Sequence, residues 1–143
     1  MHRIRIQYRV MILAIALLCL GACQNGLFST GPRTSDADIR IINHLALKDL
    51  IENHAQRTVV IDVRTSGYEQ AHIPGAIHRP LPRLRANDPQ LVGDRTLVVY
   101  AQNRHDPVSA AAAKRLITLG YQNVYDYRDG LDRWQQENPQ PNP

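Results

Sequence analysis

The stretch TLVVYA at residues 96–101 decides the fold of this chain. Its apolar run from Leu97 to Tyr100 shows no polar alternation, which is typical of a strand buried on both faces, as in a parallel sheet. A second run of the same kind, TVVID at residues 58–62, precedes it. The two runs therefore predict neighbouring central strands of an α/β protein.

Helical patterns flank both runs. Apolar residues at helical spacing predict a helix over residues 45–53, with Asn43 as its N-cap. Asp106 as N-cap and Pro107 at the first helical position predict the start of another helix, which Gly120 ends. The remaining expected elements are a helical turn at 68–71, a short strand after the Pro74-Gly75 turn, a strand at 123–127 and a helix at 131–136.

Strands that alternate with helices over this length predict a single doubly wound domain with a small parallel sheet. The sequence contains no internal repeats. In such sheets the ligand crevice lies at the carboxyl ends of the strands. Those ends correspond to residues 62–64, 101–106 and 126–128.

The N-terminal residues indicate export. Basic residues at Arg3, Arg5 and Arg9 precede an apolar run, Val10–Leu20, that is too short to span a bilayer as a mature helix but suits a signal peptide. The run ends in LGAC at residues 20–23, which resembles the bacterial lipobox and implies that Cys23 is lipidated. A plain signal peptide and an uncleaved anchor helix are the alternatives.

Lipidation would divide the chain into four parts. They are a signal peptide at 1–22, a lipid-anchored flexible tether at 23–37, the folded domain at 38–137 and a disordered tail at 138–143. The protein is then expected in the cell envelope, with the membrane as a partner through its anchor. Gln24 follows the lipidated cysteine where retained lipoproteins of this kind carry aspartate, which favours the outer membrane, facing the periplasm.

Charge and cysteine content narrow the function classes. Much of the formal net charge of +4 comes from the leader, so nucleic-acid binding is not expected. Arg79, Arg83 and Arg85 form either a local basic patch or a solvated loop face. The chain has only two cysteines, Cys19 and Cys23. A mature protein whose one remaining cysteine is the acylated Cys23 can form no disulfide.

Several motifs occur together and in order. They are IDVR at 61–64, HIPGA at 72–76, VVY at 98–100, LGY at 119–121 with Tyr125, and GLDRW at 130–134. As a set they resemble the rhodanese homology domain over about Ile42 to Gln136. The resemblance implies the rhodanese-like fold and a relation to sulfurtransferases.

Active members of that family carry a loop of the form Cys-x-x-Gly-x-Arg directly after the strand that ends here at Tyr100, and its cysteine forms a persulfide. In this chain Ala101 occupies the cysteine position. The loop that follows also lacks the glycine and is about two residues longer, while the stretch 64–72 is one residue shorter. The resemblance therefore implies a fold without its nucleophile, because only a thiolate supplies the required sulfur.

Two classes of function remain. One is a binding module, incompetent for sulfur transfer, that holds a small anion or a protein partner; the other is a sulfurtransferase or an unrecognised enzyme that uses loop 101–106. No catalytic residue, cofactor or metal site is predicted. The candidate binding residues are Gln102, Asn103, Arg104, His105 and Asp106. Structural support is the role predicted for Asp62, Arg64 and His72. A catalytic triad of Ser109, His105 and Asp106 is not expected, because three nearby residues on a turn and a helix rarely converge in that geometry.

Overall fold

The structure, a computed structural model, describes residue 35 and residues 38–139. In this part five strands form one sheet in the order β1-β5-β4-β2-β3, and every pair is parallel. The strands are β1 (Arg40–Ile41), β2 (Thr58–Asp62), β3 (Ile77–His78), β4 (Thr96–Tyr100) and β5 (Val124–Asp126). The predicted α/β fold with a small parallel sheet is confirmed.

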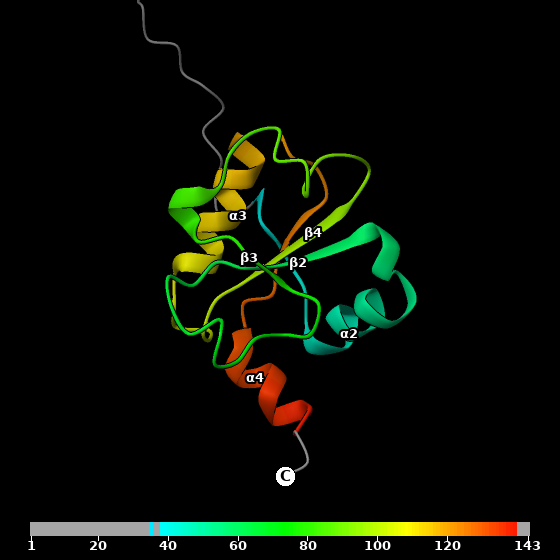
Figure 1. The fold of residues 1–143 in the computed structure, drawn as a ribbon, viewed down its shortest axis with the longest axis vertical. Coiled ribbons are helices and arrows are strands. Elements are labelled where there is room, and N and C mark those ends of the chain that lie inside the picture. Colours follow the sequence, from blue (N-terminus) through cyan, green and yellow to red (C-terminus); the bar gives the residue numbers. More distant parts are fainter. Residues whose placement is uncertain (1–34, 36–37, 140–143) are drawn as a thin grey trace, which may run out of the picture. The chain divides into compact units, whose positions relative to one another are not determined.

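Helices cover both faces of this sheet. In Figure 1, α3 lies to the left of β2 and β4, and α2 lies to their right. The α-helices of the described residues are α2 (His44–Asn53), α3 (Val108–Thr118) and α4 (Gly130–Glu137), and the short 3-10 helices are η2 (Ala55–Arg57) and η3 (Leu81–Arg83). α3 packs on one face, whereas α2 and α4 share the other.

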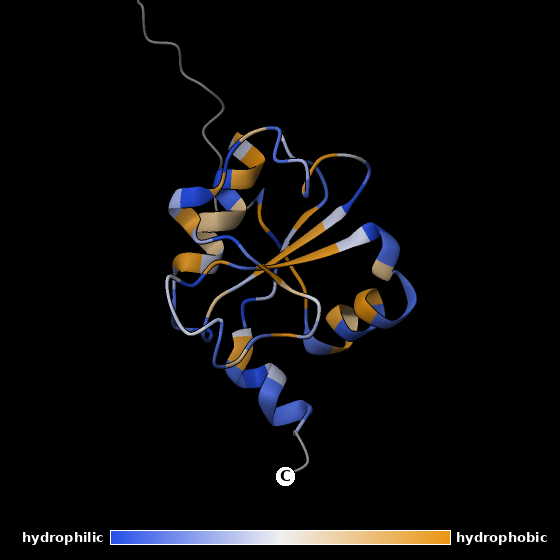
Figure 2. Ribbon diagram, in the orientation of Figure 1, coloured by the Kyte–Doolittle hydropathy of each residue, from blue (hydrophilic) through white to orange (hydrophobic). Residues whose placement is uncertain are grey.

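The alternation of side chains along β4 divides the core into two layers. Leu97 and Val99 pack toward α3 and its buried Leu116. Val98 and Tyr100 pack toward α2, where Leu47 is fully buried. Figure 2 shows β2 and β4 as hydrophobic and most of α4 as hydrophilic. Both faces of the central strands are thus removed from water, as their unbroken apolar runs predict.

The element boundaries differ from the prediction in small ways. Asn43 caps α2 as expected, because its Oδ1 accepts a hydrogen bond from the Ala46 backbone N–H at 2.9 Å. α3 begins at Val108, one residue later than predicted, since the Asp106 carboxylate closes a turn on the Val108 N–H at 3.0 Å. Strand β1 was not predicted, and β5 is shorter than the predicted 123–127.

Several predictions concern residues outside the described part. The structure does not describe the predicted signal peptide at 1–22, the predicted lipidation site Cys23 or, apart from Ser35, the predicted tether at 23–37. The predicted tail also lies outside the described residues beyond residue 139. Among the residues that the structure describes, no helix has the length and apolarity needed to cross a membrane.

Candidate functional site

A buried ion pair stands at the carboxyl end of β2. Asp62 is fully buried and Arg64 is only 8 % exposed. The Asp62 carboxylate accepts hydrogen bonds from the Arg64 backbone N–H at 3.0 Å, from Nε at 3.0 and 3.1 Å and from Nη2 at 2.6 Å. The Tyr100 hydroxyl also donates to Asp62, at 2.8 Å, and accepts from the Ile73 N–H at 3.1 Å. The network therefore ties β2, β4 and the loop before β3 together.

Burial and the charge of Asp62 act in opposite directions on the pKa of Arg64 and in the same direction on the pKa of Tyr100. Burial disfavours the charged guanidinium of Arg64, but the hydrogen bonds and the charge of Asp62 outweigh it, so the pKa of Arg64 is raised above its ordinary value. Burial raises the pKa of the Tyr100 hydroxyl as well, and the nearby Asp62 carboxylate adds to that effect. Arg64 therefore stays charged and Tyr100 stays neutral. Both side chains stabilise the fold through Asp62 and do not act as an acid–base couple.

Arg64 also reaches the loop after β4. Its Nη1 donates to Gln102 Oε1 at 2.8 Å, and the Gln102 amide donates to Asp132 Oδ1 at 2.5 Å. The Asn103 amide donates to the other carboxylate oxygen of Asp132 at 2.9 Å. Two of the predicted binding residues are therefore already engaged by α4, and Asp132 is a member of the site that the sequence analysis did not single out.

The loop backbone is fixed to α4 in the same way. The Leu131 N–H donates to the Ala101 carbonyl and the Asp132 N–H donates to the Gln102 carbonyl, both at 3.0 Å. Gly130 permits this approach, because its φ is +71° and a Cβ atom there would lie 2.7 Å from the Gln102 carbonyl. The first N–H groups of α4 thus bind loop carbonyls and are not available to an anion.

Three predicted binding residues lie on the outer part of the loop. Arg104 is 71 % exposed and pairs with Asp129, to which its Nε donates at 3.1 Å and its Nη2 at 2.5 Å. His105 is exposed, and its backbone N–H binds Asn103 Oδ1 at 3.1 Å. Asp106 is engaged by the first turn of α3. Arg104 and His105 are therefore the loop side chains most open to a ligand.

Two hollows adjoin this outer loop, one on each side. The first, of about 570 Å³, lies against α3, the end of β1 and Arg128. The second, of about 440 Å³, lies against α4 and includes Asp129, Asp132 and Arg133. The hollow against α3 has one carboxylate, that of Asp106, and an apolar side, whereas the hollow against α4 has two carboxylates beside its basic groups. The side chains of the loop can thus serve two chemically different surfaces.

Comparison with known proteins identifies the fold. The family model described as rhodanese-like domain matches residues 44–137. This chain belongs to that family. Its relatives include a thiosulfate sulfurtransferase GlpE from Coxiella burnetii, 27 % identical over 99 residues that cover 68 % of this chain and 89 % of the relative.

Solved structures agree with this assignment. A rhodanese-related protein from Thermoplasma volcanium matches with a TM-score of 0.53 at 32 % identity, covering 69 % of this chain and 93 % of the other. The human single domain sulfurtransferase TSTD1 matches with a TM-score of 0.55 at 23 % identity, covering 68 % and 96 %. The second likeness concerns the fold alone.

Within this rhodanese-like domain, the residue after β4 cannot act as a nucleophile. Ala101 is 1 % exposed and belongs to the core layer on the α3 side, together with Val99, Ala112 and Ala113. Ser109 is buried in the first turn of α3, in contrast to the exposed His105. The disfavoured triad does not assemble, since the serine is directed to the core and the histidine to solvent.

His72 lies at the loop before β3 and forms part of an aromatic stack. Its Nδ1–H donates to the Tyr68 carbonyl at 2.9 Å, and its ring stacks on Tyr68 with centroids 4.2 Å apart. His78 stacks against Tyr68 at 4.8 Å and donates through Nε2 to the Arg64 carbonyl at 2.8 Å. Histidine, cysteine and acidic side chains form no cluster fit for a metal within the described residues. The two histidines hold the loop beside Arg64.

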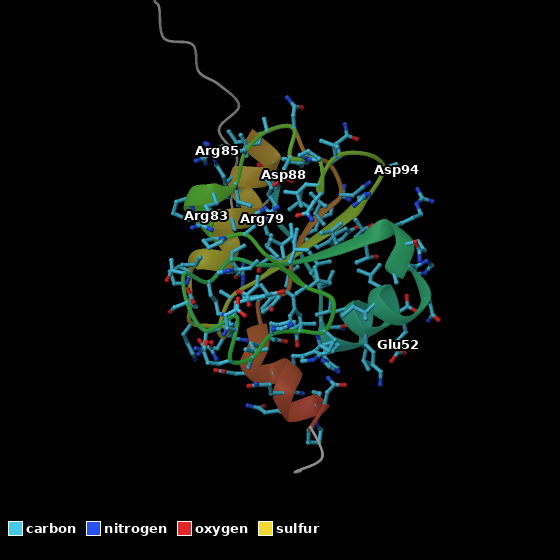
Figure 3. All side chains as sticks on the ribbon, in the orientation of Figure 1. Glu52, Arg79, Arg83, Arg85, Asp88 and Asp94 are labelled. Carbon is cyan, nitrogen blue, oxygen red and sulfur yellow. The ribbon has the colours of Figure 1, made fainter. Side chains whose placement is uncertain are left out.

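The basic cluster predicted from Arg79, Arg83 and Arg85 lies over η3, as Figure 3 shows. Arg79 donates to Asp88 Oδ2 at 3.1 Å, and Arg85 donates to backbone carbonyls of its own loop. Burial would raise the pKa of Asp88, but the Gln90 backbone N–H and then Arg79 outweigh it and hold that pKa below its ordinary value. Two of the three arginines therefore hold the loop between β3 and β4.

A second Asp-x-Arg sequence stands at the carboxyl end of β5. Asp126 is fully buried and its Oδ2 accepts from Arg128 Nε at 3.1 Å. In contrast to Asp62, its Oδ1 has no hydrogen-bond partner among the described residues. The spacing equals that of Asp62 and Arg64, and this repetition is the signal by which the sequence could have revealed the pair.

Proposed function

We propose that this protein is anchored to the cell envelope by a lipid at Cys23 and that its rhodanese-like domain binds a small anion or a protein partner without transferring sulfur. The binding surface is the outer part of loop 102–106. Membership of the rhodanese-like family supplies the fold and the relation to sulfurtransferases. The lack of activity, the anchor and the binding role are the new elements of the proposal.

The observation that carries the proposal is Ala101. It directly follows β4, where the loop begins, and its side chain is packed into the core. Sulfane sulfur transfer needs a thiolate that is charged and discharged, and residues 38–139 contain no cysteine. Because the domain has no thiolate for sulfur transfer, we assign it a binding function instead.

The proposed anchor is supported by the sequence alone. Arg3, Arg5 and Arg9 precede the apolar run Val10–Leu20, and LGAC at residues 20–23 provides the lipobox cysteine. A tether of the composition found in residues 24–36 would let the domain move relative to the membrane surface. The binding surface would then act on ligands or partners within reach of that surface.

The alternative is an enzyme. The relative from Coxiella burnetii carries the name thiosulfate sulfurtransferase, and this name is what favours sulfur transfer as the second candidate function. For this chain to retain it, another group would have to replace the missing thiolate. Neither Ser109, which is buried, nor the exposed His105 can carry sulfane sulfur in that way.

The test is a sulfur-transfer assay on the full-length chain purified in a mild detergent. With thiosulfate and cyanide we expect thiocyanate to form no faster than with heat-treated protein, and mass spectrometry to find no sulfur adduct in the folded domain. The double variant Cys19→Ser/Cys23→Ser is the matched control, because it removes both cysteines of the chain. A rate well above the heat-treated control that survives in this double variant would refute the proposal.

A further inference from the structure

The hollow against α3 has features of a binding site that the predicted loop residues alone do not explain. It measures about 570 Å³ and lies between loop 104–107, the exposed side of α3 and the ends of β1 and β5. Neither Ala101 nor Gln102 lines it, so it is separate from the position of the missing nucleophile. We call this hollow the α3 cleft.

Arg128 is the best placed ligand-binding group of the α3 cleft. Its Nε is held by the buried carboxylate of Asp126 at 3.1 Å, and its side chain is 36 % exposed. Neither terminal amino group hydrogen-bonds to a residue of the described part, whereas those of Arg64 are both engaged. A guanidinium fixed at its base with free terminal N–H groups is preorganised to bind an oxyanion through two parallel hydrogen bonds.

The other groups of the α3 cleft favour the same kind of ligand. Arg104 and His105 contribute from the loop and Lys114 from α3, so four basic side chains from three segments line it. Among the described residues, the only carboxylate that lines the cleft belongs to Asp106, and one of its oxygens accepts from the Val108 N–H. Two of these groups are paired from outside the lining, Arg104 with Asp129 and Arg128 with Asp126. The convergence of basic groups within the lining itself favours an anion.

One wall of the α3 cleft is apolar. Ile41 is 56 % exposed although it is a large hydrophobic residue, and it lines the cleft together with Ala110 and Ala111 of α3. The volume exceeds what an inorganic oxyanion needs. An apolar wall beside a cationic floor fits a ligand with an acidic head and a small hydrocarbon body.

We propose that the α3 cleft binds a small organic oxyanion, a phosphate or carboxylate on an apolar body, with Arg128 as its bidentate ligand and Asp126 as the residue that positions Arg128. This inference rests on the proposed function, that the loop surface binds rather than catalyses, and it adds the ligand class and the principal residue. The apolar body would contact Ile41 and Ala111.

Calorimetric titration of the full-length chain at pH 7 and low ionic strength tests the proposal, with phenyl phosphate and inorganic phosphate as probes. We expect saturable binding of both, with phenyl phosphate several-fold tighter because of the apolar wall. Ala111→Glu places a carboxylate in the cleft at an exposed helical position, without altering the Asp126–Arg128 pair. It should weaken both probes on the order of tenfold or more.

Matched variants separate the site from general charge effects. Ala111→Gln has nearly the same shape as Ala111→Glu without the charge, so it should weaken binding of the probes several-fold less than Ala111→Glu does. Arg57→Gln removes a cation that pairs with Asp94 outside the cleft, and it should bind within about twofold of the wild type. Arg128→Lys keeps the charge but loses the fork, and it should bind several-fold more weakly. A far-ultraviolet circular dichroism spectrum checks that each variant is folded.

Two results would overturn the inference. One is the lack of saturable binding of either probe up to about 10 mM, a concentration that allows for very weak affinity. The other is equal binding by Ala111→Glu and Ala111→Gln. Neither result bears on sulfur transfer, which the thiosulfate assay measures separately, so failure of the ligand assignment and failure of the proposed function are distinguishable.

Discussion

The two Asp-x-Arg pairs, Asp62–Arg64 and Asp126–Arg128, predict that replacing the aspartate by asparagine lowers the free energy of unfolding by different amounts. In the first pair, Asp62→Asn removes the carboxylate that accepts hydrogen bonds from Nε and Nη2 of the Arg64 guanidinium and from the Arg64 backbone N–H. The guanidinium, only 8 % exposed, is then left without its charged partner. The Tyr100 hydroxyl also loses its charged acceptor. Removing one partner of a buried ion pair costs about 3–5 kcal/mol, and domains of this size have about 5–15 kcal/mol in total.

The matched substitution is Asp126→Asn. Asp126 is equally buried, but its carboxylate accepts one hydrogen bond and its Oδ1 has no partner among the described residues. Arg128 is 36 % exposed and can be hydrated once its partner is neutral. Burying an unpaired carboxylate oxygen is itself unfavourable, so neutralising the group relieves part of the loss. We expect Asp126→Asn to change the unfolding free energy by no more than about 1 kcal/mol.

Urea unfolding at pH 7 measures the change in unfolding free energy that each of the two substitutions causes. Trp134 is the only tryptophan, is 9 % exposed and lies in the core layer beside α2, so its fluorescence reports loss of packing. The two variants change composition identically, so effects on the unfolded chain largely cancel in their difference. The expected difference is at least about 2 kcal/mol with an unchanged denaturant slope. Equal losses, or a larger loss for Asp126→Asn, would refute the reasoning from hydrogen-bond satisfaction.

Three further predictions use the same unfolding assay or a thiol assay. Gly130→Ala should lower stability by roughly 2–4 kcal/mol, because its Cβ would lie 2.7 Å from the Gln102 carbonyl at a φ of +71°; a neutral effect would mean that the loop moves freely away from α4. The fold lowers the pKa of Asp88. The ionised Asp88 carboxylate therefore adds to the free energy of unfolding above the pKa that Asp88 has in the unfolded chain, and this stabilisation is lost as pH falls through its pKa in the folded protein. Asp88→Asn should therefore cost about 1 kcal/mol of unfolding free energy at pH 7, and this cost should shrink as pH falls through the folded-state pKa of Asp88; a cost that does not change with pH would exclude this linkage. Ala101→Cys should give a thiol that reacts slowly with a disulfide reagent and no sulfur transfer, since position 101 is 1 % exposed in apolar surroundings; rapid labelling and turnover would show that only the nucleophile is missing.

The sequence predicted the parts of the fold that local patterns determine. The apolar runs of β2 and β4 and the Asn43 cap needed only their own residues. Strand β1 has two residues, Arg40 and Ile41, and pairs with β5 across most of the chain. No local pattern distinguishes so short an edge strand, because its hydrogen bonds depend on a partner placed by the rest of the fold.

The same distinction applies to the site. The Asp62–Arg64 pair spans two residues, and its components were predicted together. The contact of Gln102 with Asp132 spans 30 residues, and its geometry depends on how closely Gly130 lets α4 approach the loop. Asp126 and Arg128 are again close in sequence. Their spacing could have been noticed, but the unengaged terminal N–H groups of Arg128 could only be found in the structure.

These contacts bear on where an anion can bind in this domain. The first N–H groups of α4 donate to the Ala101 and Gln102 carbonyls, and the Val108 N–H of α3 donates to Asp106. Neither helix start therefore offers a complete set of donors, although a helix N-terminus is the usual anion site of an α/β fold. The guanidinium of Arg128 does offer them, held in place by a buried carboxylate. The anion site that we propose thus lies on the α3 side of the loop, away from Ala101, which does not line the α3 cleft.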